Sequence, residues 1–541
     1  MNVSSSGLPL AALALGLGNH LYWKRYERES TTLMLVFTSL LPQPVILALV
    51  TSSFNLKGIL VSCAYFTLSL LASILVYRLS PFHPLADVPG PVVARITKLW
   101  SFYIASTGNM PRVLKRLHDK YGSIVRIGPN EISIVDSEAV EAVYGQNGLP
   151  KGKFYSIRTD PHNPTNLLFM TGPPHARRRQ RWNRALGMEA VKYYEEVISR
   201  QTNKLLDKLQ EELSAGEIDI SRKFGHFTFD IMGEVSFGQK FETLKTNDSH
   251  RYVQSVLDFS EKVNVLAWLP WAFHVMGLIP SIAKARGRLV AFSRECAGLR
   301  VTSGASVKDI WYHLMDEADR EQEKPSIPEV VADGILAIIA GSDTSASAMA
   351  SVIWFVLRHP ECYQILQKEV DAIFADGENF LDSSRHKELS YLSACISEAL
   401  RLHPPNATNG PREVPYGSGG RTILGRYLPE GTQVLVPPYV VHRNPKNFSS
   451  PEKFLPSRWM RNLDANFVHK PEAFIPFSYG PASCVGRALA LKEMLFALSS
   501  LFFKFELQFA PGFDYEGWER TRKDYFISPS GPLALVLRER H

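Results

Sequence analysis

A single cysteine near the end of the chain stands where its sulfur could have a chemical role. Cys484 lies in the stretch FSYGPASCVGRALALKEM, between two glycines, and an apolar run typical of a helix follows it. The amino-terminal end of a helix favours a thiolate, because backbone N–H groups and the helix dipole point at the sulfur. A cysteine thiolate can hold haem iron and push electron density onto it. That role needs an exposed sulfur with a depressed thiol pKa. A buried structural cysteine is the alternative for Cys484 taken alone.

A second candidate group lies inside the apolar run from Val330 to Arg358, in the stretch AIIAGSDTSAS. A helix of this length spans roughly 40 Å and could cross a whole domain. Burying Asp343 and Thr344 there is costly unless both have partners. The Thr344 hydroxyl can donate to the carbonyl oxygen of Ala340, one turn earlier. A solvent-facing stripe of a Ser/Thr-rich helix is the alternative.

Two further charged groups have helical spacing. Glu398 and Arg401 in SEALRLHPP are three residues apart, and Arg458 in FLPSRW follows later. His175 and Arg179 in HARRRQRW are four apart, so that they share one helix face. Taken singly, such groups are most often surface ion pairs or solvated basic helices that stabilise little.

Together and in this order, the motifs resemble those of the cytochrome P-450 superfamily, in particular its membrane-anchored fungal members. The cysteine-loop signature of that family matches Phe477, Gly480, Cys484 and Gly486, with Ala482 at the position where a basic residue is usual. The resemblance implies that Cys484 is the axial ligand of the iron in haem, iron protoporphyrin IX. It leaves open which residue replaces the propionate contact missing at Ala482.

The resemblance also implies roles for the other motifs. Asp343 and Thr344 are the expected catalytic residues, which deliver protons to dioxygen at the haem. Glu398, Arg401 and Arg458 form the family's structural triad, which fixes the segment leading into the cysteine loop. Further residues expected to hold the cofactor, beside the cysteine loop itself, are His175, Arg179, Arg412 and His442.

The function implied by the resemblance is that of a haem-thiolate monooxygenase. It inserts one oxygen atom from O2 into a lipophilic small molecule, with electrons from NADPH through NADPH–cytochrome P-450 reductase and cytochrome b5 as a further candidate partner. The pathway expected is secondary metabolism, such as terpenoid tailoring. One alternative is a haem-thiolate isomerase or dehydratase without oxygen insertion, which the intact Asp343–Thr344 pair disfavours. Another is a membrane-anchored protein that binds without catalysis, which Cys484 in its loop disfavours.

The elements that must position these residues are mostly helical. Helical periodicity is clear in residues 191–213, 330–358 and 363–374. Residues 121–136 alternate apolar and polar side chains around Gly-Pro-Asn and predict a β-hairpin. Further strands are predicted in residues 421–427 and 433–437, and a second hairpin in residues 526–540. We therefore expect residues 93–541 to form one mainly α domain (α+β) with small β-sheets, the cytochrome P-450 fold.

The first eighty residues predict a membrane anchor. Residues 30–56 and 58–77 carry no charge, and each is long enough for a spanning helix of about 20 residues. Pro42 and Pro44 kink or split the first run. Residues 8–18 are a weaker third candidate, so that two and three transmembrane segments are both open. Residues 81–92 contain four prolines and predict a stiff hinge.

Basic residues set the expected orientation. Lys24, Arg25 and Arg28 follow the first run, and Arg78 follows the last. If these stay cytosolic, the catalytic domain faces the cytosol from the endoplasmic reticulum membrane, and three spans put the sequon at Asn2 in the lumen. The segment from Val263 to Pro280 either dips into the membrane or packs in the core as two ordinary helices.

Composition excludes several other classes of function. The net charge of +7 is too small over 541 residues to indicate nucleic-acid binding. Five widely spaced cysteines disfavour both a zinc site and a disulfide scaffold.

Overall fold

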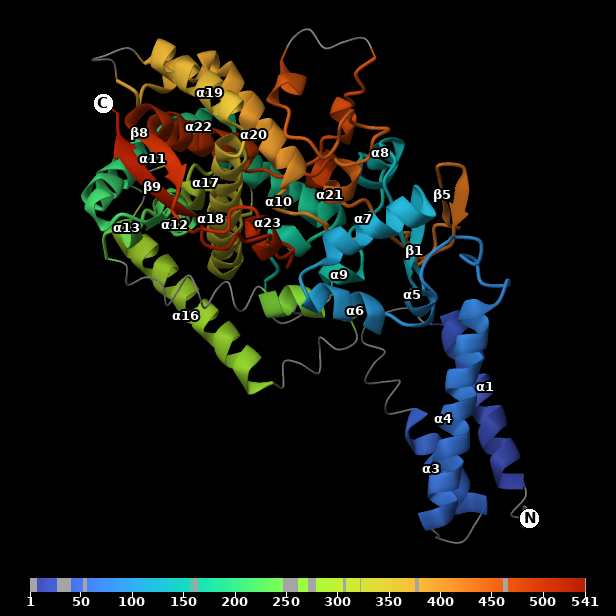
Figure 1. The fold of residues 1–541 in the computed structure, drawn as a ribbon. Helices are drawn as coiled ribbons and strands as arrows, with labels where there is room; N and C mark the ends of the chain where they lie inside the picture. Colours follow the sequence, from blue (N-terminus) through green and yellow to red (C-terminus); the bar gives the residue numbers. More distant parts are fainter. Residues whose placement is uncertain are drawn as a thin grey trace.

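The longest helix, α18 (Ile327–Leu357), runs through the body of the molecule (Figure 1). It begins with a capping box, in which the Glu329 carboxylate accepts a hydrogen bond from the backbone N–H of Ser326 at 3.0 Å. The whole stretch from Ser345 to Val356 is buried. Helix α12 (Ile220–Phe237) packs along it. The helix predicted for residues 330–358 is thereby confirmed, and it places Thr344 near the middle of the body.

The computed structural model describes the chain except for residues 1–6, 27–39, 52–55, 157–158, 160–163, 247–260, 271–278, 305–307, 322, 375–378, 461–465 and 541. The helices predicted for residues 191–213 and 363–374 are confirmed as α11 (Met188–Glu211) and α19 (Pro360–Ile373). The helices of the body beside α12 and α18 are α5 (Val92–Ile96), α6 (Leu99–Ser106), α7 (Met110–Tyr121), α8 (Glu138–Tyr144), α9 (Lys153–Ser156), α10 (Gly172–Ala185), α11 (Met188–Glu211), α13 (Thr243–Thr246), α16 (Pro280–Ser303), α17 (Ile310–Leu314), α19 (Pro360–Ile373), α20 (Ser390–Leu402), α21 (Pro438–Val441), α22 (Arg487–Lys504) and α23 (Trp518–Thr521).

A four-stranded sheet of order β1-β2-β7-β4 covers one part of the body. β1 (Ile124–Gly128) and β2 (Glu131–Ile134) form the hairpin predicted for residues 121–136. β7 (Gln433–Leu435) runs parallel to β2 and carries β4 (Arg412–Glu413) on its other side. This pairing brings residues 412–435, from the last quarter of the chain, beside its first strands.

Two smaller sheets complete the fold. β5 (Arg421–Ile423) and β6 (Arg426–Leu428) form a hairpin. β8 (Phe505–Phe509) pairs with β9 (Ala534–Glu539), which also pairs with β3 (Ile218–Asp219). The hairpin predicted within residues 526–540 is therefore wrong. Pro529 and Pro532 lack the N–H that a ladder needs, and the strand finds its partner directly after α22 instead.

Three helices stand together as a stalk beside the body, with the amino terminus at the far end (Figure 1): α1 (Gly7–Tyr26), α3 (Pro42–Thr51) and α4 (Leu56–Leu79). α1 packs along α4, where the Ser69 hydroxyl donates to the carbonyl oxygen of Leu13 at 2.7 Å. Of the described helices, only α4 and α18 are long and apolar enough to cross a membrane, and α18 is mostly buried in the body. α3 has ten residues, about 15 Å, which is half of a bilayer core.

A buried arginine joins the stalk to the body. Arg126 on β1 is fully buried and has no carboxylate among its hydrogen-bond partners. Its guanidinium donates to the carbonyl oxygens of Pro129 (2.8 Å), Leu85 (3.3 Å) and Arg78 (3.4 Å). The end of α4, the proline-rich segment and the first sheet thus meet at one side chain. Burial lowers the pKa of Arg126 to about 10, still well above neutral pH.

The first part of the segment 263–280 packs in the core. Leu266, Ala267, Trp268 and Leu269 are all buried, and the Trp268 ring lies against Phe154 with the ring centroids 5.4 Å apart. Core packing therefore accounts for this part, whereas residues 271–278 lie outside the described part of the chain.

Candidate active site

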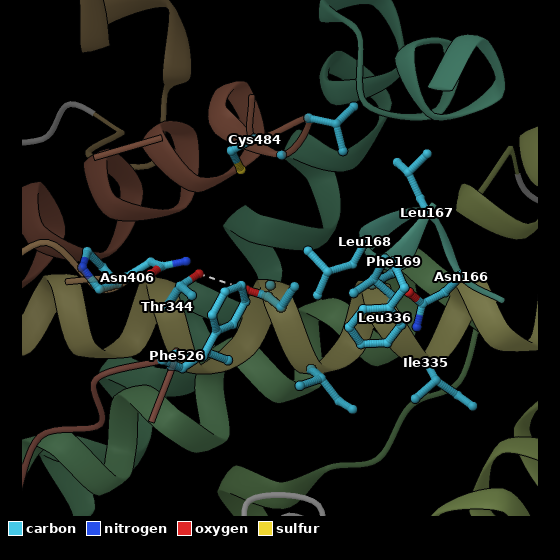
Figure 2. Close-up of a pocket in the computed structure, with 18 of the residues that line it drawn as sticks. Asn166, Leu167, Leu168, Phe169, Ile335, Leu336, Thr344, Asn406, Cys484 and Phe526 are labelled. Atoms are coloured by element: carbon cyan, nitrogen blue, oxygen red, sulfur yellow. Dashed lines mark hydrogen bonds between the residues drawn. The ribbon is translucent and has the colours of Figure 1, made fainter. Parts of the chain in front are cut away.

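A cavity of about 1160 Å³ opens between α18 and the loop that carries Cys484 (Figure 2). Pockets for small molecules in proteins commonly measure 300–1,000 Å³, so this cavity is large enough for more than one small molecule. Its lining comes from α10, α16, α18 and α22, from the 3-10 turn η1 (Leu167–Phe169), and from the loop around Phe526. Most of the lining is apolar.

The cysteine loop has the geometry expected from its sequence. The Cys484 sulfur is exposed to the cavity, and the backbone N–H of Cys484 donates to the carbonyl oxygen of Phe477 at 2.8 Å. Gly480 has a φ of +68°, and a Cβ there would collide with the carbonyl oxygen of Tyr144. Only glycine adopts this conformation readily beside another backbone. Gly486 is the residue before α22, so the start of that helix lies beside the sulfur.

The pKa of the Cys484 thiol differs from the prediction. Burial among protein atoms raises the pKa of Cys484 above its ordinary value. The backbone N–H of Gly486 and the guanidinium groups of Arg179 and Arg487 act in the opposite direction without reversing the shift. The depressed pKa expected from the helix start is therefore wrong for the protein alone, because desolvation outweighs these donors. Binding of a metal cation to the sulfur would favour the thiolate.

Thr344 faces the same cavity from α18, and Figure 2 shows it across the space from Cys484. Its hydroxyl donates to the carbonyl oxygen of Ala340 at 2.7 Å, as expected from the sequence. Asp343 is half-buried and does not line the cavity itself. Burial raises the pKa of its carboxyl to about 7, so that it can exchange a proton near neutral pH.

Three of the four basic side chains expected at the cofactor reach the cavity. His175 and Arg179 lie one turn apart on α10, and Arg412 lies on β4. Arg179 donates to the carbonyl oxygen of Ser483 at 2.6 Å and so touches the cysteine loop. Arg412 is 7% exposed, and its Nε has no partner among the described residues. Burial and the neighbouring basic groups lower the pKa of His175 to about 4, so that its ring is neutral near pH 7, whereas Arg179 and Arg412 direct positive charge at the cavity.

His442 is not part of this lining. Its Nδ1 donates to the carbonyl oxygen of Arg401 at 2.9 Å, and its Nε2 accepts from the N–H of Ile475 at 2.9 Å. Both ring nitrogens are therefore used inside the protein, and the ring is fully buried. His442 therefore does not line the cavity with the other three residues, and its contact with the cofactor stays a prediction; its ring links the triad to the segment before Phe477.

The two arginines of the triad both bind the carboxylate of Glu398. Glu398, Arg401 and Arg458 are all fully buried. Glu398 accepts from Arg401 at 2.8 and 2.9 Å, from Arg458 Nε at 2.9 Å, and from the backbone N–H of Leu455 at 2.9 Å. Trp459 Nε1 donates a further bond at 2.9 Å. Although burial opposes it, Arg401 and Arg458 hold the pKa of Glu398 below its ordinary value.

Two functional candidates were missed from the sequence. Lys151 lines the cavity, and burial together with the neighbouring Arg412 and Arg179 lowers its pKa to about 7. Glu493 on α22 also lines it, and burial raises the pKa of its carboxyl to about 8. A lone acid in the apolar helix after Cys484 was a usable signal. Nothing local marks Lys151, which is placed by its backbone pairing with Arg412.

The model of the cytochrome P450 family matches residues 89–533 of this chain. Similar curated proteins support the match. A cytochrome P450 monooxygenase, cpaH, from Aspergillus oryzae is 31% identical over 470 residues, which cover 85% of this chain and 90% of the relative. The tryprostatin B 6-hydroxylase of Aspergillus fumigatus is 30% identical over 529 residues, 97% of this chain and 93% of the relative. The chain belongs to the cytochrome P450 family.

Membership makes the protein a haem monooxygenase, an oxidoreductase that incorporates oxygen with haem as its cofactor. The residues present fit this group. The sulfur of Cys484 is open to the cavity, and Lys151, His175, Arg179 and Arg412 lie close enough to perturb one another. Glu493 is the only carboxylate among the described lining residues. Two propionate carboxylates would satisfy this excess of cationic donors, including the unpartnered Arg412 Nε.

Proposed function

We propose that this chain is a membrane-anchored haem-thiolate monooxygenase that inserts one atom of O2 into a lipophilic small molecule of secondary metabolism. NADPH supplies two electrons through NADPH–cytochrome P450 reductase, with cytochrome b5 as a second donor, and the other oxygen atom leaves as water. The observation that carries the proposal is the open sulfur of Cys484 facing Thr344 across a largely apolar cavity. Hydroxylation of the substrate is the simplest such reaction, in keeping with the activity named for the relative from Aspergillus fumigatus.

In this mechanism the protein holds the cofactor and moves protons. Haem supplies the chemistry that activates dioxygen. Cys484 would ligate its iron, and Lys151, Arg179 and Arg412 would hold its propionates. The Thr344 hydroxyl, which donates to Ala340, keeps its lone pairs free to accept a hydrogen bond from the cavity side. Asp343, with a pKa of about 7, takes up and releases the proton that Thr344 passes on.

A reduced-plus-CO difference spectrum of the full-length protein tests the cofactor assignment. The wild-type chain is expected to show the red-shifted Soret band of a thiolate ligand, and Cys484→Ser is expected to lose it. An unchanged spectrum in Cys484→Ser would refute the proposal.

Turnover assays distinguish the three candidate functions. A monooxygenase consumes NADPH and O2 with its reductase and labels the product from 18O2. A haem-thiolate isomerase or dehydratase converts a peroxide or oxime without NADPH, and a binding protein turns over neither. Thr344→Ala is expected to lower the product formed per NADPH without changing the CO spectrum.

We also propose that α4 anchors the protein in the endoplasmic reticulum membrane with the body in the cytosol. Arg78 at the body end of α4 supports this orientation. Phe82 (88% exposed), Val92, Val93 and Tyr103 are exposed apolar side chains that follow α4 in sequence and suit a membrane surface. Alkaline extraction of microsomes tests the anchor, protease protection tests the orientation, and an endoglycosidase shift tests whether Asn2 is lumenal.

A further inference from the structure

Four asparagines line the otherwise mainly apolar cavity, and they fall into two pairs. Asn406 Oδ1 accepts from the backbone N–H of Asn409 at 2.8 Å, and Asn409 Nδ2 donates to the hydroxyl of Ser478 at 3.4 Å. These two carboxamides belong to the protein's own hydrogen-bond network. The other two, Asn166 and Asn264, have no such role.

Asn166 stands at the residue before η1, where asparagine often caps the turn with its side chain. Its side chain makes no capping bond here, and its Oδ1 is buried without a hydrogen-bond partner among the described residues. Figure 2 shows this carboxamide among Phe169, Ile335 and Leu336, all of which line the cavity. An amide oxygen among such side chains has only a ligand or water to pair with.

Asn264 belongs to the helical residues 261–266 and is 8% exposed. Within the described part of the chain, no hydrogen bond reaches its carboxamide. Val263 and Leu266, beside it in sequence, are apolar and line the same cavity. The Asn264 side chain, only 8% exposed, therefore brings to the cavity a donor and an acceptor that no described residue pairs with.

Leaving buried amide groups unpaired destabilises a protein, and the loss is recovered when a ligand supplies the partners. A carboxamide donates through N–H and accepts through C=O, so that its best complement is another amide. Sites built to hydrogen-bond a substrate N–H strongly reject the analogue that lacks it, because the site's own polar groups are then left unpaired. A pure hydrocarbon substrate would leave both Asn166 and Asn264 unsatisfied.

We propose that the substrate carries at least one secondary amide or lactam on an apolar skeleton, and that Asn166 and Asn264 recognise its N–H and C=O groups. The inference rests on the proposed monooxygenase function and narrows its substrate class. It favours an amide-bearing molecule over the terpenoid expected from the sequence. The two asparagines fix orientation, while the surrounding apolar lining supplies the contact area.

The test is a spectral binding titration of the ferric, full-length holoprotein with three probes. They are the cyclic dipeptide of leucine and phenylalanine, which presents two lactam groups on a rigid ring, its N,N′-dimethyl analogue, and a diterpene hydrocarbon. The wild-type protein is expected to bind the N–H form at least about tenfold more tightly than either other probe. Asn264→Leu and Asn166→Leu are each expected to bring the ratio of the two dipeptide affinities close to one.

Asn203→Leu is the matched control, because it makes the same change at an exposed asparagine of α11 that does not line the cavity. It is expected to keep the wild-type ratio. Equal binding of both dipeptides, no shift with the N–H form, tighter binding of the hydrocarbon, or an unchanged ratio in both asparagine variants would each overturn the proposal. The reduced-plus-CO spectrum and the NADPH-dependent uptake of O2 are read separately, so that a failure here is distinguishable from a failure of the monooxygenase assignment.

Discussion

Removing the carboxylate of Glu398 should have the largest effect of any single substitution outside the cavity. In Glu398→Leu the guanidinium groups of Arg401 and Arg458 stay buried but lose the only anionic partner that they have among the described residues. Five hydrogen bonds to that carboxylate, all between 2.8 and 2.9 Å long, disappear together. Breaking a buried ion pair by removing one partner costs about 3–5 kcal/mol, because the other charge is left uncompensated.

The measurement is the midpoint of urea unfolding, followed by the loss of the thiolate-type CO spectrum and by circular dichroism. The spectrum is expected to vanish at a lower urea concentration than the helical signal, because Leu455 and Trp459 next to the triad lead into the cysteine loop. Glu388→Leu is the matched control. Glu388 pairs with Arg385 at the same three-residue spacing, but that pair lies at the surface. Surface pairs of this kind stabilise little, so that the control should unfold like the wild type.

The outcome that contradicts this reasoning is a Glu398→Leu protein that unfolds at the same urea concentration as Glu388→Leu. It would mean that water or a rearranged carboxylate compensates the two arginines. Glu398→Gln keeps one acceptor oxygen and is expected to lie between the wild type and Glu398→Leu.

Three further changes have defined outcomes. Burial lowers the pKa of His442 to about 3, below its ordinary value. The neutral ring therefore contributes fully to the free energy of unfolding above pH 6.5, and this contribution is lost as the pH falls towards 3. Acid unfolding of wild type and His442→Gln should therefore differ in slope by about 1.4 kcal/mol per pH unit in that window. Gly480→Ala should lose haem faster than the wild type, because its Cβ collides with Tyr144; equal haem retention would contradict this. Lys151→Met should speed the transfer of haem to apomyoglobin, and adding Ala482→Arg to this variant should slow the transfer again. No change on either substitution would refute propionate binding by Lys151.

Long elements with one clear period were predictable from the sequence. The run from Val330 to Arg358 gave α18 to within three residues, and the Gly-Pro-Asn turn gave the β1–β2 hairpin. The strand β8 was not predicted, because FELQF continues the apolar run of α22 and short apolar runs do not distinguish helix from strand. The second error, the tail hairpin, has the same origin: β9 pairs with a strand that the sequence did not reveal.

The site was predictable where a local motif carries it. The same cavity is reached by five predicted residues: His175, Arg179, Thr344, Arg412 and Cys484. Of these, His175 and Cys484 are about three hundred residues apart in the sequence. The rest depends on burial and on distant pairing. Local spacing cannot show that the ring of His442 is enclosed by backbone groups or that desolvation raises the pKa of Cys484.

The asparagine pair and Lys151 illustrate the same limit. Nothing in the neighbouring residues distinguishes Asn264 from an asparagine at the surface. Its role is visible only once the fold has buried it with an unused donor and acceptor. Lys151 becomes a candidate because β4 places Arg412 beside it across the chain.

The arginine at the root of the stalk has a consequence for shortened forms of the protein. A chain cut to begin at Pro89, where the family match starts, would remove the carbonyl groups of Arg78 and Leu85 that Arg126 now uses. The guanidinium would keep Pro129 and would have to recruit water for its other N–H groups. Cutting away the stalk to gain solubility would therefore loosen the first hairpin as well as remove the proposed membrane anchor.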